Sequence, residues 1–72
     1  MKDIALHRKV FSERLKEYID DKSVLSFSKK IGIPERTVNA WIRKETTPSM
    51  EYLILLAEEL SCSIDYLVGL ED

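Results

Sequence analysis

Apolar residues recur at steps of three and four along almost the whole chain, which is the spacing of one face of an α-helix. In the first third, Phe11, Leu15, Tyr18 and Ile19 fall on one such face and predict a helix over 6–21. Two Gly and two Pro leave few sites for the tight turns that a sheet of short strands needs. We therefore expect an all-α fold.

Residues that start and stop helices divide the rest of the chain into short segments. A serine before an apolar segment can accept a hydrogen bond from the first turn, and a glycine after one can close the helix in a left-handed conformation. The starting serines are Ser23, Ser49 and Ser63, and the closing glycines are Gly32 and Gly69. Pro34 fits the first position of a helix, where its missing N–H costs nothing. The sequence predicts a compact bundle of five short helices, over 6–21, 24–31, 34–43, 50–60 and 64–68.

Length and composition limit the classes of protein to consider. Seventy-two residues make a single domain over 1–72, with 1–7 as a candidate flexible arm in which His7 is solvated. The single Cys62 cannot form an internal disulfide, and with one histidine it cannot build a metal site, so we expect buried filler, a cytoplasmic protein and no metal or cofactor. No apolar run approaches the roughly 20 residues of a membrane helix, so no membrane partner is expected.

Charge is unevenly distributed, although the net charge is only −2. Residues 22–47 hold six basic and two acidic residues, for a net charge of +4, whereas 48–72 hold six acidic residues and no basic one. Such asymmetry is consistent with an anionic partner for the middle of the chain, and equally with an uneven solvated surface.

The segment 23–43 has the organisation of a DNA-reading helix-turn-helix, two short helices joined by Gly32-Ile33-Pro34. The second helix has two unlike faces. Val38, Trp41 and Ile42 form the inward face, and Glu35, Arg36, Asn39, Ala40 and Arg43 form the outward one. An exposed Arg can fork onto guanine, Asn can pair with adenine, and Ala can contact a thymine methyl group. By contrast, nothing indicates catalysis: the one histidine has no placed carboxylate partner, and there is no glycine-rich phosphate loop.

Several short motifs carry a more specific likeness. They are Arg14-Leu15-Lys16-Glu17, Lys30-Ile31-Gly32-Ile33, Thr37-Val38-Asn39-Ala40-Trp41, Pro48-Ser49, Tyr52-Leu53, Leu56-Ala57, Leu60 and Ser63-Ile64-Asp65-Tyr66-Leu67-Val68-Gly69. From 11 to 72 the chain resembles the Cro/repressor-type family of helix-turn-helix domains, also described as phage-repressor-like or xenobiotic-response-element type. The resemblance implies a lambda-repressor-like DNA-binding domain in which Trp41 is core.

The resemblance and the outward face together give a set of expected DNA contacts. The expected base-reading residues are Glu35, Arg36, Asn39 and Ala40, and the expected phosphate contacts are Ser23, Lys29, Lys30, Thr37, Arg43 and Lys44. We expect a homodimeric transcriptional repressor that binds a palindromic double-stranded operator, with no small-molecule ligand evident.

Departures from the family pattern keep a second hypothesis open. Val24 stands where the family usually has a phosphate-binding Gln, and Lys44 stands where it has a Gly. Ile19 and Ile42 replace a buried Arg–Glu pair, and Ser61 replaces a closing Gly. The alternative is a helix-turn-helix adaptor or antirepressor that binds protein rather than DNA.

Overall fold

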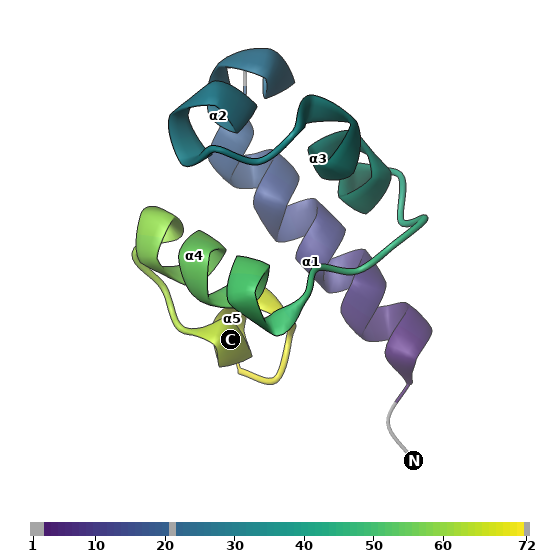
Figure 1. Cartoon of the computed structure of the whole chain (residues 1–72). Helices are drawn as coiled ribbons and strands as arrows, with labels where there is room; N and C mark the ends of the chain where they lie inside the picture. The colour runs from purple at the N-terminus through teal and green to yellow at the C-terminus, as the bar shows by residue number, and fades with distance from the viewer. Residues whose placement is uncertain (1–2, 21, 72) are drawn as a thin grey trace.

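The computed structural model describes residues 3–20 and 22–71, and it is an all-helical bundle. Its helices are α1 (Ile4–Ile19), α2 (Val24–Ile31), α3 (Glu35–Ile42), α4 (Met50–Leu60) and α5 (Ile64–Leu67). The long α1 runs diagonally through the molecule, with α2 and α3 on one side and α4 and α5 on the other (Figure 1). The predicted five-helix fold is confirmed. None of the described helices combines the length and the apolar character needed to cross a membrane.

The predicted serine caps are present at three of the helices. The hydroxyl oxygens of Ser23, Ser49 and Ser63 accept backbone N–H groups three residues ahead, at 2.9, 3.3 and 3.0 Å. At the opposite ends, Gly32 and Gly69 have φ angles of 79° and 84°. These local interactions satisfy helix ends that would otherwise leave backbone groups unpaired.

The first helix starts earlier than the sequence suggested. The Asp3 carboxylate accepts the N–H groups of Ala5 and Leu6, at 3.0 and 3.3 Å, so the helix begins at Ile4. Of the expected arm over 1–7, residues 4–7 are therefore helical, and 1–2 lie outside the described residues. The helix ends at Ile19, ahead of the expected 21, because Asp20 has a φ of 51° and leaves the helical conformation.

The expectation of a solvated His7 is wrong. The side chain is half-buried, and Nδ1 lies 2.6 Å from the carbonyl oxygen of Val68 at the end of α5. Nearby, Gly69 packs so closely on α1 that a Cβ there would lie 3.0 Å from Val10 Cγ1. The environment of this histidine is determined by tertiary contact between α1 and the end of α5. The local sequence pattern gives no sign of that contact.

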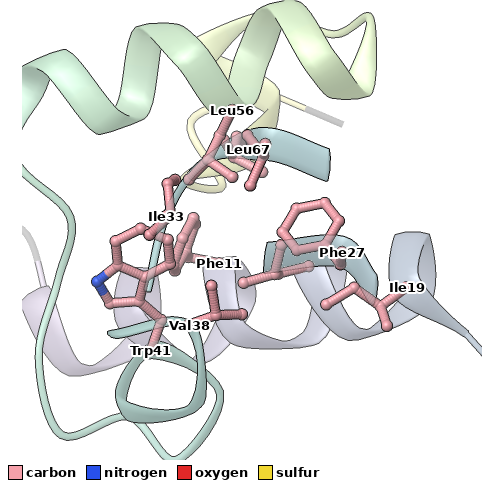
Figure 2. Close-up of a cluster of buried hydrophobic side chains, with 10 residues drawn as sticks. Phe11, Ile19, Phe27, Ile33, Val38, Trp41, Leu56 and Leu67 are labelled. Atoms are coloured by element: carbon pink, nitrogen blue, oxygen red, sulfur yellow. The ribbon is translucent and has the colours of Figure 1, made fainter. Parts of the chain in front are cut away.

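The core lies where α1 meets the other four helices. Its buried apolar residues are Phe11, Leu15, Ile19, Phe27, Ile31, Ile33, Val38, Trp41, Leu56 and Leu67. Trp41 is 1% exposed and lies edge-to-face with Phe11, with ring centroids 6.0 Å apart (Figure 2). It makes a second edge-to-face contact with Tyr52, at 5.6 Å between ring centroids. Burying each such side chain contributes roughly 1.5–3 kcal/mol. The expectation that Trp41 is a core residue is confirmed.

Arg14 ties the C-terminal segment to α1. Its guanidinium carbon lies 3.9 Å from the centre of the Tyr66 ring, and its Nη1 donates to the carbonyl oxygens of Tyr66 and Glu71. Cys62 packs half-buried against the core, and desolvation raises the pKa of its thiol despite the opposing charge of Arg14. A raised pKa disfavours the reactive thiolate, which agrees with the expected role as filler.

Candidate nucleic-acid interface

The turn between α2 and α3 is built from two backbone bonds and one buried side chain. The N–H groups of Gly32 and Ile33 donate to the carbonyl oxygen of Ser28, at 2.8 and 3.1 Å. Ile33 is 2% exposed and anchors the turn in the core. Pro34 and Arg43 prove to be the caps of α3 rather than its first and last residues. The two helices are thus held in a fixed relation, as the motif at 23–43 predicts.

Burial of one side of α3 leaves the opposite side open. Val38 and Trp41 are buried, whereas Glu35 and Arg36 are exposed and Asn39 and Ala40 are half-buried. At 100° per residue, positions 36 and 43 point in directions that differ by only about 20°. Arg36 and Arg43 therefore lie along the centre of the outward face, which we call the α3 face.

The two edges of the α3 face differ in their surroundings. On one side, Arg36, Thr37, Ala40 and Arg43 line an open hollow of about 500 Å³ that the loop over 45–49 completes. On the other side, Asn39 lines a separate hollow beside the end of α1, with Lys16, Lys22, Val24 and Ile42 among its neighbours. The structure thus groups three of the expected DNA contacts around Arg36 and places Asn39 on the opposite edge.

The end of α3 is a Schellman motif with a lysine where glycine is usual. The Glu45 N–H donates to the Ala40 carbonyl oxygen at 2.9 Å, and the Lys44 N–H donates to that of Trp41 at 3.0 Å. Lys44 itself has a φ of 65° and an exposed side chain. The chain accepts the strain of a left-handed lysine here, one residue beyond Arg43.

Arg43 is already engaged by an acid that the sequence analysis did not single out. Its Nε lies 3.2 Å from Glu45 Oε2, and its Nη2 lies 3.5 Å from Oε1. Both side chains remain more than half exposed, at 59% and 57%. The pair is therefore exposed on the same surface as Arg36 and Ala40, and it lines the same hollow.

Lys30 is likewise paired, with an acid of α4. Its ammonium lies 2.9 Å from Glu59 Oε2, and the Tyr18 hydroxyl lies 3.3 Å from the same oxygen. The hydrogen bond that Lys30 donates to Glu59 lowers the pKa of the Glu59 carboxyl and raises the pKa of the Lys30 ammonium. Lys30 thus braces α2 against α4, whereas Lys29 has an exposed side chain beside it.

Two further expected contacts have a local structural role as well. The Ser23 oxygen accepts the Ser26 N–H, which leaves its own O–H free to donate to a phosphate. Glu35 lies in the first turn of α3, which has no side-chain cap, and its negative charge is favourable beside unpaired N–H groups. Val24 packs half-buried against the core and offers no donor.

A comparison with known families matches residues 15–67 to the helix-turn-helix family, and this range covers most of the chain and all of α2, α3, α4 and α5. The chain belongs to the Cro/repressor-type helix-turn-helix family. This family consists of DNA-binding regulators, so membership indicates that this helix-turn-helix protein binds DNA in the regulation of transcription. Comparisons with curated proteins and with solved structures gave no match.

In this helix-turn-helix protein, contacts between distant segments could not be predicted from the sequence. The pairing of Lys30 with Glu59 and the bond from the Ser12 hydroxyl to the Ile42 carbonyl oxygen join residues some 30 positions apart. Spacing within a helix carries no signal for either. Glu45 is only two residues from Arg43, so its pairing could have been considered from the sequence. The backbone turn of the Schellman motif is what brings its carboxylate to the guanidinium.

Proposed function

We propose that this protein is a repressor that binds double-stranded DNA sequence-specifically, with the α3 face in the major groove. The observation that carries the proposal is the uncovered line of Arg36 and Arg43 on a short helix whose opposite side is fixed by Val38 and Trp41. A rigid helix with forked donors on its open face has the shape and chemistry for reading base edges. Repression needs only occupancy of the operator, so we propose it rather than activation.

The surrounding charges support this orientation. The segment 22–47, which contains α2 and α3, has a net charge of +4, and the acidic segment 48–72 contains α4 and α5. Phosphate contacts from Ser23, Lys29, Lys44 and Thr37 would flank the base-reading residues Glu35, Arg36, Asn39 and Ala40. Lys30 contributes only if DNA displaces Glu59 from its ammonium group. A domain with segregated charge approaches DNA with its acidic side turned away.

We further propose that two copies bind a palindromic operator. One helix-turn-helix reads one half-site, and paired half-sites are centred roughly 34 Å apart. Leu70 is 54% exposed just beyond α5 and is a candidate for contact between the copies. Footprinting on a selected operator should then protect two half-sites, whereas protection of one half-site by a single copy would contradict the pairing.

The experiment that tests DNA reading compares wild type with Arg36→Ala on sequences selected from a random duplex pool. Arg36→Ala should cost about 1–3 kcal/mol of specific binding and relax the preference at one base position. A matched control is Lys9→Ala, which removes an exposed charge from α1 at a position that lines neither hollow of the α3 face. Unchanged affinity and preference in Arg36→Ala would remove this residue from the base-reading set.

The second candidate is an adaptor that binds protein through the same face. Two observations favour it: Val24 replaces a phosphate donor, and Lys30 and Arg43 already have acidic partners. A salt titration with random duplex separates the two functions. If the protein binds DNA, its affinity should fall steeply with salt, with a slope of log affinity against log salt concentration of about −1 per phosphate contacted. If it is an adaptor, it should not bind the duplex even at low salt.

A further inference from the structure

The Arg43 guanidinium presents one edge to Glu45 and leaves another edge open. Glu45 occupies the side formed by Nε and Nη2, at 3.2 and 3.5 Å. A guanidinium is planar and has five donors, so the end formed by Nη1 and Nη2 still offers two parallel N–H groups. This end has the spacing to pair with the O6 and N7 atoms of guanine.

The backbone, rather than the ion pair, sets the position of the carboxylate. The two hydrogen bonds of the Schellman motif, from Lys44 and Glu45 to the carbonyls of Trp41 and Ala40, place Glu45 next to the last turn of α3. An ion pair that is more than half exposed adds little to folding, because water screens it and two long side chains must be ordered. The pair is therefore of consequence for how the arginine meets a ligand rather than for the stability of the fold.

We propose that Arg43 reads a guanine and that Glu45 is the residue that positions it for this task, which adds Arg43 to the base-reading residues of the proposed function. The sequence resemblance implies a phosphate contact for Arg43. Attraction to phosphate depends on net charge, and the paired carboxylate cancels that charge. Reading of a base depends on directed donors, and the pairing holds those donors in one orientation. The pair thus favours a base edge over the DNA backbone. This inference rests on the proposed sequence-specific binding.

Selection from a random duplex pool with wild type, Arg43→Lys and Glu45→Gln tests the inference. Arg43→Lys keeps the positive charge but lacks the fork, so it should lose about ten-fold or more of the preference for one guanine while its binding to random duplex stays strong. Glu45→Gln should raise the affinity for random duplex, increase the magnitude of its salt slope by about one, and weaken the same guanine preference. Glu51→Gln, the same charge change on α4, should produce none of these three effects.

Failure of the guanine contact and failure of the proposed DNA-binding function give different results in this selection. A shared loss of one guanine in the Arg43 and Glu45 variants, with the other positions of the motif retained and thermal melts like wild type, supports the guanine contact. If Arg43→Lys selects the same motif as wild type, the guanine contact is overturned and sequence-specific binding is left intact. If wild type selects no motif at all, the proposed function is overturned and the guanine contact with it.

Discussion

The Ser12 hydroxyl on α1 donates a hydrogen bond of 2.7 Å to the backbone carbonyl of Ile42, the last residue of α3. Ser12 has no solvent exposure, and the last carbonyls of a helix have no partner within the helix. A buried serine that is 30 residues away in sequence thus closes the end of the helix on which the proposed DNA contacts lie.

Ser12→Ala should destabilise the protein by about 1–2 kcal/mol, because it leaves a partly buried carbonyl without its donor. Urea unfolding followed by circular dichroism measures the loss. Ser26→Ala is the matched control, since Ser26 is exposed on α2 and alanine is the better helix former. Equal stability of the two variants would mean that water replaces the Ser12 hydroxyl at no cost.

Ile42→Glu should destabilise by several kcal/mol, on the order of 3, since it places a charge against apolar neighbours without a partner. Ile42 packs half-buried against the core and lines the same hollow as Ile19. In the family pattern a buried Arg–Glu pair occupies these two positions, so Ile19→Arg combined with Ile42→Glu should recover part of the loss. A thermal melt of the single and double variants checks both statements, and an unchanged melt for Ile42→Glu would place Ile42 in solvent.

Lys44→Gly should stabilise the protein by up to about 1 kcal/mol, because glycine adopts the positive φ at this position without a Cβ clash. Ser61→Gly should do the same, since Ser61 closes α4 with a φ of 55°. Chemical unfolding measures both. Only Lys44→Gly should also weaken binding to random duplex and reduce the magnitude of the salt slope by about one. Equal DNA affinities for the two variants would remove Lys44 from the phosphate contacts.

Substitution of Ser23 separates its capping role from its proposed phosphate contact. Aspartate is as good an N-cap as serine, so Ser23→Asp should melt close to wild type, whereas Ser23→Ala should lose about 1 kcal/mol. The added carboxylate of Ser23→Asp should nevertheless repel a phosphate and weaken DNA binding. Ser63→Asp makes the same change at the cap of α5 and should leave DNA binding unaltered. DNA affinities that are equal in the two Asp variants would contradict a phosphate near Ser23.

Glu59 should give the stability a specific dependence on acid pH. Its pKa in the folded protein is lowered from the usual 4.5, chiefly by the hydrogen bond from Lys30. A carboxyl whose pKa is lowered by folding contributes stability above pH 4.5. That stability is lost as the pH falls through the pKa of the carboxyl in the folded protein. The melting temperature of Glu59→Gln should therefore fall less than that of wild type below about pH 5, and Glu58→Gln, an exposed neighbour, should behave like wild type. Parallel curves for all three proteins would mean that the pair does not survive in solution.

The sequence by itself determined the helices and the identity of the family. Apolar spacing located the buried stripe of α3, and the serine and glycine positions located most helix ends, because caps and periodicity are interactions between residues close along the chain. The earlier start of α1 was missed, although Asp3 is a local signal, since none of the described residues before Phe11 belongs to the apolar core. The outward direction of Arg36 also followed from periodicity alone.

Tertiary structure alone decided which charges and polar groups have partners. Lys30 meets Glu59 because α2 packs on α4, whereas His7 meets Val68 and Ser12 meets Ile42 because α1 packs against α5 and α3. Spacing along one helix cannot encode such pairs, because they depend on the relative placement of two helices. Even the pairing of Arg43 with Glu45, two residues apart, depends on a left-handed Lys44 that turns the backbone at the end of α3. The candidate DNA contacts could therefore be named from the sequence, but which of them carry a free charge is set by the fold.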